Sequence, residues 1–217
     1  MIKSSYLYVK EITDVELKTK HTMKMKEFEA LSFEYKGKTF EKCIDHEWIA
    51  DACDNIISII KKRRSYTKIL YVSLLDSSVP FEEELSSKAT WKIDIMRISY
   101  PSCSVTKSTD KFNIKAPIDV DRVKGRDVII LGGIVDTGLT MQKVIAALKA
   151  AGAKSVKIVC VLDKVGKHPD LPILYSAFDI KDKFVVGYGM DFDGELHDIP
   201  HIYATGLAKD EELVLGK

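Results

Sequence analysis

The sequence predicts an α/β fold in which a central parallel sheet is flanked by helices. Short apolar, β-branched runs alternate with segments of helical periodicity, a pattern typical of a sheet covered on both faces. One strand–helix–strand unit can be outlined between residues 127 and 162, and such a unit makes its two strands parallel. The chain has 217 residues, 46% of them hydrophobic, which suits one domain with a sizeable core.

The first patterned segments predict a hairpin and a helix. Residues 1 to about 40 are mixed in composition, but LSFEYKGKTF alternates loosely around Gly37 and favours a hairpin. From Asp45, a possible N-cap, DHEWIADACDNIISIIKKRR has helical spacing and ends in basic residues. Its expected buried face consists of residues three or four apart, namely Trp48, Ile49, Ala52, Ile56, Ile59 and Ile60.

Two further strands enclose the next predicted helix. Lys68–Leu75 (KILYVSLL) predicts a buried strand, Asp76–Ser78 a turn, and Pro80 the start of the helix FEEELSSKA. Trp91–Ile98 predicts the following strand. Tyr100–Pro117 is polar and lacks a clear period, and loops of that length are usually functional lids or disordered.

The strand–helix–strand unit is the clearest part of the pattern. Asp127–Leu131 predicts its first strand and Val156–Leu162 its second, with Gly152 closing the helix between them. The expected core face of that helix is Met141, Val144, Ile145, Leu148 and Ala151. Phe184–Tyr188 (FVVGY) predicts a later strand. In an open parallel sheet, ligands bind at the carboxyl ends of the strands.

Composition excludes several classes of function. The net charge of +1 gives no general attraction to nucleic acid or to a membrane surface. No apolar run approaches the ~20 residues of a membrane span, and the N-terminus is too charged for a signal peptide. The cysteines form no close pair, so neither a CxxC redox site nor a zinc ligand set is visible, and a reducing cytoplasm is the expected location. They are Cys43, Cys53, Cys103 and Cys160.

The most informative stretch is Asp127–Thr140, DVIILGGIVDTGLT. A buried strand is followed by a short loop with an acid, two threonines and a glycine, and then by a helix. This order places backbone N–H groups and hydroxyls at a helix N-terminus, where phosphate groups bind. The loop matches neither GxGxxG nor GxxxxGK[ST]. Asp136 either caps the helix or takes part in chemistry.

This stretch resembles the phosphate loop of the type I phosphoribosyltransferases, in the version found in hypoxanthine-guanine phosphoribosyltransferases. VIILGGIVDTGLTMQKVIAAL, VKIVCVLDK and DKFVVGYGMDFDGELHDIPHIY follow one another at that family's spacing. The likeness covers roughly residues 45–203. It implies a single domain over residues 1–217 with the fold of that family, including a small hood built from about residues 1–40 and 165–217.

The resemblance implies a role for each matching residue. The ribose 5-phosphate would be held by the loop residues Asp136, Thr137, Gly138, Leu139 and Thr140. Asp136 would also act as general base near purine N7. Lys164 would donate to the purine 6-oxo group, Phe184 would stack on the base, and the backbone of Val185 would read its edge. Asp191 would meet magnesium or its waters.

Four positions depart from the family pattern. The two residues ahead of the loop are usually acidic and hold the ribose hydroxyls and nearby metal, but here they are Gly132 and Gly133. One hydrogen bond to a charged group contributes about 1.5–3 kcal/mol, so losing two costs about 3–6 kcal/mol of binding. Asp76 stands in a turn whose backbone usually meets pyrophosphate, and His197 stands where an arginine usually reaches it.

For several of these residues an ordinary structural interpretation stays open. Lys164 can be a solvated lysine just past a strand, and Phe184 can belong to the core. Asp191 lies among other acids and can be a turn residue. Gly132 and Gly133 can serve close backbone approach at the strand end.

Two functions of different classes follow. The first is a 6-oxopurine phosphoribosyltransferase of purine salvage, which uses Mg²⁺, forms a nucleoside monophosphate and pyrophosphate from hypoxanthine or guanine and phosphoribosyl pyrophosphate, and assembles as a homodimer or homotetramer. The alternative is a catalytically silent paralogue that binds a purine nucleoside monophosphate as a sensor or partner subunit. The departures motivate the alternative, because they fall on the ribose and pyrophosphate positions and leave the 5-phosphate and purine positions intact.

Overall fold

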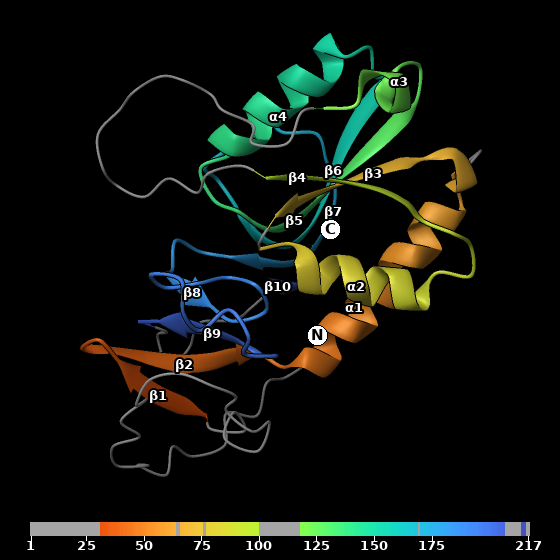
Figure 1. The fold of residues 1–217 in the computed structure, drawn as a ribbon. Helices are drawn as coiled ribbons and strands as arrows, with labels where there is room; N and C mark the ends of the chain where they lie inside the picture. The colour runs from red at the N-terminus through yellow and green to blue at the C-terminus, as the bar shows by residue number, and fades with distance from the viewer. Residues whose placement is uncertain are drawn as a thin grey trace.

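The chain forms two sheets in the computed structural model, which describes residues 31–63, 66–75, 77–99, 118–168, 170–206 and 214–215 (Figure 1). The larger sheet has the strand order β10-β7-β6-β5-β3-β4, and the smaller has the order β1-β2-β9-β8. The strands are β1 Ser32–Tyr35, β2 Lys38–Ile44, β3 Leu70–Leu75, β4 Asp94–Ser99, β5 Asp127–Val135, β6 Ser155–Lys164, β7 Ile173–Ile180, β8 Val185–Val186, β9 Ile202–Thr205 and β10 Val214–Leu215. The helices are α1 His46–Lys61, α2 Val79–Lys88, α3 Val120–Val123 and α4 Leu139–Ala150, with a 3-10 turn at Tyr66–Lys68.

The larger sheet confirms the predicted central parallel sheet flanked by helices. Strands β4, β3, β5, β6 and β7 run parallel, and β10 pairs antiparallel with β7 at one edge. Helices α1 and α2 lie on one side of the sheet, and α3 and α4 lie on the other (Figure 1). Alternate residues of β5 face the two sides: Ile129 packs in the α1/α2 core, whereas Val128 and Ile130 pack in the α3/α4 core.

The predicted hairpin is confirmed, and it belongs to the smaller sheet. Strands β1 and β2 pair antiparallel around a turn in which Lys36 and Gly37 have φ values of 47° and 72°. Strand β2 pairs in turn with β9, so that Phe40 lies opposite Thr205. The smaller sheet therefore joins a segment before the central sheet to one that follows it.

Helix α1 is confirmed, but its buried face is shifted from the predicted one. Cys53 and Ile57 are buried, whereas Trp48 is 41% exposed and Ile59 is only half-buried. The buried face of α1 therefore includes Cys53 and Ile57, which were not predicted, and excludes Trp48, which was. Asp45 occupies the N-cap position without a side-chain cap bond, because its carboxylate pairs with Lys42 at 2.7 Å.

Strand β5 is longer than the sequence predicted. The prediction ended at Leu131, but β5 continues to Val135 because β6 offers a pairing partner along its whole length. Gly132 lies opposite Cys160, and the two glycines are therefore part of the strand. The predicted core face of α4 is confirmed for its four buried residues, Met141, Val144, Ile145 and Leu148.

The region after β6 holds two corrections. Strand β7 was not predicted, because ILYSAFDI mixes polar and apolar residues without a clear alternation. The strand predicted at Phe184–Tyr188 is reduced to β8 and pairs antiparallel with β9 in the smaller sheet, since Gly187, with φ of 92°, turns the chain. Asp76, Cys103 and Tyr100–Pro117 lie outside the described residues. Within the described residues, no helix combines the length and apolar character needed to cross a membrane.

Candidate active site

The loop between β5 and α4 has the geometry of an anion-binding helix N-terminus. Gly138 is the N-cap of α4 and has a left-handed backbone with φ of 76°, and no side chain caps the helix. Thr137 Oγ1 accepts from the Leu139 N–H at a long 3.5 Å. Leu139 is 59% exposed, so the first turn of the helix opens to solvent. The N–H groups and positive dipole end of α4 are therefore accessible to an anionic ligand.

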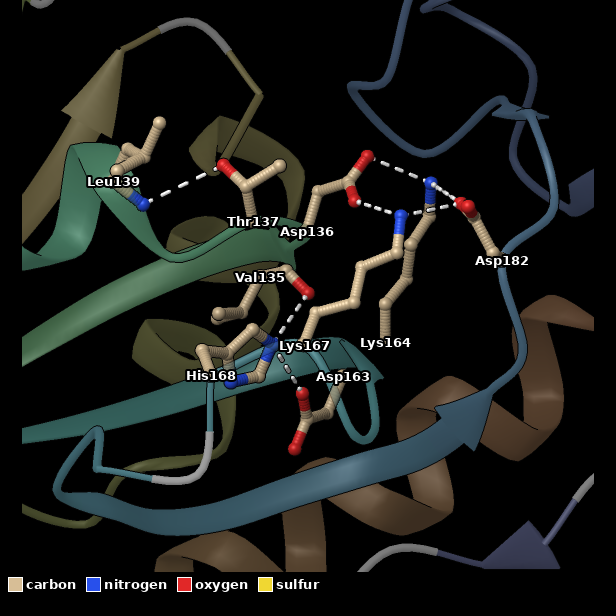
Figure 2. Close-up of polar contacts among 9 residues, drawn as sticks. All are labelled: Val135, Asp136, Thr137, Leu139, Asp163, Lys164, Lys167, His168 and Asp182. Atoms are coloured by element: carbon tan, nitrogen blue, oxygen red, sulfur yellow. Dashed lines mark hydrogen bonds and ion pairs between the residues drawn. The ribbon is translucent and has the colours of Figure 1, made fainter.

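Asp136 and Lys164, which the sequence singled out, meet at the carboxyl ends of β5 and β6 (Figure 2). Lys164 Nζ donates to Asp136 Oδ2 at 2.7 Å, and its side chain is only 7% exposed. Asp136 does not cap α4. The interpretation of Lys164 as a solvated lysine is thus wrong for this structure. Its ammonium group is buried and pairs with a carboxylate instead of with water.

Two residues that sequence reasoning missed complete this cluster. Lys167 Nζ donates to the second Asp136 oxygen, Oδ1, at 3.1 Å and lies 2.7 Å from Asp182 Oδ1. Lys164 Nζ also lies 3.3 Å from Asp182 Oδ1. The four side chains form an alternating ring of charges, which we call the ion-pair ring (Figure 2). The available signal was weak: two lysines three residues apart, followed by an acid near the candidate purine segment.

The ion-pair ring keeps Asp136 ionised. Burial raises the pKa of Asp136, but hydrogen bonds from Lys164 and Lys167 outweigh that effect and hold its pKa below the ordinary value of 3.8. The same lysines lower the pKa of Asp182, and Asp182 raises the pKa of Lys167. Each Asp136 oxygen therefore accepts from one ammonium group and keeps a further lone pair that can accept a proton or another donor.

The candidate stacking residue, Phe184, is not a core side chain. Its ring is 39% exposed and packs edge-to-face on Phe192, with a centroid separation of 5.2 Å. Lys38 Nζ lies 5.1 Å from the ring centroid, and Phe40 lies 6.2 Å away. The hairpin thus supports a half-exposed aromatic ring two residues beyond Asp182, next to β8, where Val185 pairs with Ala204.

Asp191 and His197 lie in the segment between β8 and β9. Asp191 is exposed, and its Oδ2 accepts from the Gly194 N–H at 2.7 Å, as an acid in a turn does. His197 is half-exposed, with Nε2 3.1 Å from Asp198. It lines a cleft of about 720 Å³ with Glu83 and Tyr188 among others, and that cleft includes none of Asp136, Lys164 or Phe184.

Among the described residues that the sequence singled out, Asp191 offers an exposed carboxylate of the kind that magnesium binds. Mg²⁺ commonly keeps several waters and uses one or two carboxylates plus substrate phosphates, so a single exposed carboxylate suffices. The side chains of Asp45, Glu47 and His201 lie close enough together to share a metal ion, but their other contacts do not suit one. Lys42 already pairs with Asp45, and His201 Nδ1 accepts the His46 backbone N–H.

Gly133 makes room for a main-chain carbonyl. A Cβ built on Gly133 would lie deep inside the van der Waals radius of Ser77 O and 3.1 Å from the Ser77 carbonyl carbon. A Cβ on Gly189 would lie 2.5 Å from the same oxygen. Gly132 differs, because its Cβ would meet the flexible end of Met141 at 2.7 Å. The interpretation of Gly133 as a close-approach glycine is thereby supported.

Comparisons with known proteins identify the family of this chain. A family described as "Phosphoribosyl transferase domain" matches residues 44–193. The chain is 34% identical over 179 residues to a protein of Lactococcus lactis named hypoxanthine-guanine phosphoribosyltransferase, covering 80% of this chain and 94% of that relative. A Mycoplasma genitalium protein of the same name is 28% identical over 163 residues, covering 73% of this chain and 91% of the relative.

Solved structures give the same result. A crystal structure of a Bacillus anthracis hypoxanthine-guanine phosphoribosyltransferase superposes with a TM-score of 0.68 at 27% identity, covering 77% of this chain and 97% of that chain. A Staphylococcus aureus hypoxanthine phosphoribosyltransferase superposes with the same TM-score at 25% identity, covering 76% of this chain and 91% of that one.

Proposed function

The chain belongs to the phosphoribosyl transferase domain family, and we infer from this membership and from the site that it is a 6-oxopurine phosphoribosyltransferase. It converts hypoxanthine or guanine and phosphoribosyl pyrophosphate to a nucleoside monophosphate and pyrophosphate. The observation that carries this function is the meeting of three parts at one sheet edge. These are an open helix N-terminus for a phosphate, an ionised carboxylate at Asp136, and a buried ammonium at Lys164. The silent-paralogue alternative receives no support from relatives that are named as enzymes.

In this proposal, the chain's residues divide the chemistry between them. The loop from Thr137 to Thr140 holds the ribose 5-phosphate through N–H groups and hydroxyls. Lys164 leaves Asp136 and donates to the purine 6-oxo group, which selects against a 6-amino purine. The freed Asp136 Oδ2 then accepts the purine N7 proton as the ring attacks the ribose carbon and the carbon–pyrophosphate bond breaks.

Lys164 exchanges the Asp136 carboxylate for the purine 6-oxo oxygen in this proposal, so the ion-pair ring rearranges. Lys167 remains on Asp136 Oδ1 when Lys164 departs, because Asp182 holds it from the other side at 2.7 Å. Phe184 covers one face of the purine. Asp191 is the residue that would hold magnesium or its waters, and the ion would neutralise charge on the departing pyrophosphate.

Nucleotide synthesis is the direct test of this function. With phosphoribosyl pyrophosphate and Mg²⁺, we expect guanine to give guanosine monophosphate and hypoxanthine to give inosine monophosphate. Pyrophosphate should form in the same amount as the nucleotide, and adenine should give no product. A steady-state assay that measures both products checks this result. Absence of product at high enzyme concentration, together with calorimetric binding of guanosine monophosphate, would instead favour the silent paralogue.

Removal of Lys167 is expected to change the pH dependence of the reaction. Lys167 lowers the pKa of Asp136, so Lys167→Gln raises that pKa. The base works when ionised, that is, above its pKa, and the acid limb of the kcat/KM profile should therefore move to higher pH. The profile from pH 4 to pH 8 measures the shift.

Lys154→Gln is the matched control for this experiment. Lys154 makes a comparable exposed ion pair, 3.6 Å from Asp127, at the opposite end of β5 and β6. Its removal should leave the acid limb in place. An acid limb unchanged in Lys167→Gln would contradict the role given to the ion-pair ring.

The proposal extends to assembly and location. We expect a homodimer or homotetramer, which sedimentation of the purified chain measures. A cytoplasmic location agrees with three buried free thiols, Cys43, Cys53 and Cys160, since a reducing compartment keeps such groups unoxidised.

A further inference from the structure

A buried imidazole–carboxylate pair lies beneath the phosphate loop, and the proposed reaction does not use it. The side chains of His168 and Asp163 are 3% and 13% exposed, and His168 Nε2 lies 3.1 Å from Asp163 Oδ1 (Figure 2). Asp163 is at the carboxyl end of β6, directly before Lys164. Burial raises the pKa of Asp163, and its buried Oδ1 accepts no hydrogen bond within the described residues, so the imidazole is its nearest polar neighbour.

His168 contacts both ends of the phosphate loop. Its Nε2 lies 3.3 Å from the carbonyl oxygen of Val135, the residue directly before Asp136. A carbonyl oxygen can only accept, so the contact is a hydrogen bond in the tautomer with the proton on Nε2, and that one proton then does not serve Asp163. At the other end of the loop, a Cβ on Gly138 would lie 2.8 Å from His168 Cβ and 3.3 Å from its Cγ. The ring therefore lies directly under the loop.

The loop has little of its own to fix its shape. Gly138 is the residue type with the greatest backbone freedom, and it begins α4 without a side-chain cap. The hydrogen bond between Thr137 Oγ1 and the Leu139 N–H, at 3.5 Å, is too long to restrain it strongly. The contacts between His168 and the loop therefore determine where the N–H groups of the loop point.

We propose that His168 is a positioning residue for phosphate binding, which holds residues 135–139 in the anion-binding conformation, with the Asp163 carboxylate as the charged group beside its imidazole. The inference rests on the proposed function only in naming ribose 5-phosphate as the ligand. A loop held in its bound conformation loses less conformational entropy when it binds, and affinity rises accordingly. The effect should appear in binding of the phosphate group and not in binding of the purine.

Two variants of similar size separate positioning from packing. His168→Leu removes the N–H, whereas His168→Gln keeps an N–H that can reach the Val135 carbonyl. In calorimetry with ribose 5-phosphate and with guanosine monophosphate, we expect His168→Leu to weaken both ligands by about tenfold, and His168→Gln to retain most of the affinity. The KM for phosphoribosyl pyrophosphate should rise in His168→Leu while the KM for guanine changes little.

Further variants guard against trivial outcomes. His201→Leu removes another partly buried histidine beside an aspartate, with Nδ1 3.4 Å from Asp45 Oδ1, and should leave ribose 5-phosphate affinity unchanged. If His168→Leu does not fold, Asp163→Asn replaces it, because asparagine keeps the side-chain volume and loses the charge. That variant should weaken ribose 5-phosphate by about threefold to tenfold.

The outcomes distinguish this inference from the proposed function. Wild-type affinity for ribose 5-phosphate in both His168→Leu and Asp163→Asn, with only a lower unfolding temperature, would show a stabilising role alone and overturn the proposal. Failure of the wild-type protein to bind either phosphate ligand would overturn it as well. A wild-type protein that binds ribose 5-phosphate but makes no nucleotide would refute the proposed function, and the comparison of His168 variants would still decide the positioning role.

Discussion

Introducing the acidic pair that the resemblance implies, by Gly132→Glu and Gly133→Asp, is expected to destabilise the protein rather than raise its activity. At Gly133 any side chain collides with the main-chain carbonyl of Ser77, and the same oxygen packs so close to Gly189 that a Cβ there would lie 2.5 Å from it. Overpacking of this kind costs typically about 1–3 kcal/mol, and aspartate adds the burial of a charge. Urea denaturation and the steady-state assay measure the two expected losses.

The neighbouring glycine provides a matched control for this prediction. A Cβ on Gly132 would meet the terminal methyl of Met141, which can turn away, and otherwise only Cys160 Cβ at an ordinary 3.6 Å. Gly132→Ala should therefore lower the free energy of unfolding less than Gly133→Ala does. Equal stabilities of the two alanine variants, or a gain of activity in Gly133→Asp, would show that the Ser77 segment moves aside and would refute this account.

Replacing Asp136 by asparagine should give the largest loss of catalysis. General-base catalysis contributes about 10²–10⁴-fold, and an amide cannot take the purine proton. The change also leaves one of the two lysines with Asp182 alone as acceptor, since the amide oxygen can serve Lys164 or Lys167 while the amide nitrogen faces the other. We expect kcat for guanosine monophosphate synthesis to fall by this factor.

A binding measurement separates the loss of the base from a loss of the site. Guanosine monophosphate should still bind to Asp136→Asn, because the N–H groups at the start of α4 and the ring of Phe184 are unchanged. A fall in kcat smaller than about tenfold would remove Asp136 from its role as base. Loss of nucleotide binding would instead mean that the substitution disrupts the ion-pair ring as a structural unit.

The sequence predicted the parts of the site that depend on local order. Asp136 follows a strand and precedes a helix, and Lys164 ends the next strand, so parallel pairing alone brings them to one edge. The central sheet followed from the same alternation of apolar runs. The strand at Phe184–Tyr188 had a clear apolar signal, but that signal does not specify which sheet a short strand joins.

Contacts between distant segments could not be predicted from local patterns. The close approach of Ser77 to both Gly133 and Gly189 joins three separate segments. A glycine in a sequence does not indicate which distant residue packs against it. His168 and Lys167 lie after the end of β6, where no periodicity tells which way a side chain points. Burial of Cys53 in place of Trp48 likewise depends on how α1 packs against the sheet and not on its apolar spacing alone.

The pairing of β2 with β9 determines which parts of the fold can form early during synthesis and which form late. Strands β3 to β6 lie within residues 70–164, so their pairings, the phosphate loop and Lys164 can form before the last part of the chain leaves the ribosome. The ring of Phe184 packs near Phe40 of β2. Strand β2 pairs with β9, which is synthesised near the end of the chain, and pairings between segments so far apart in sequence form slowly. We therefore expect a chain terminated before residue 202 to lack a complete purine subsite while keeping its phosphate loop.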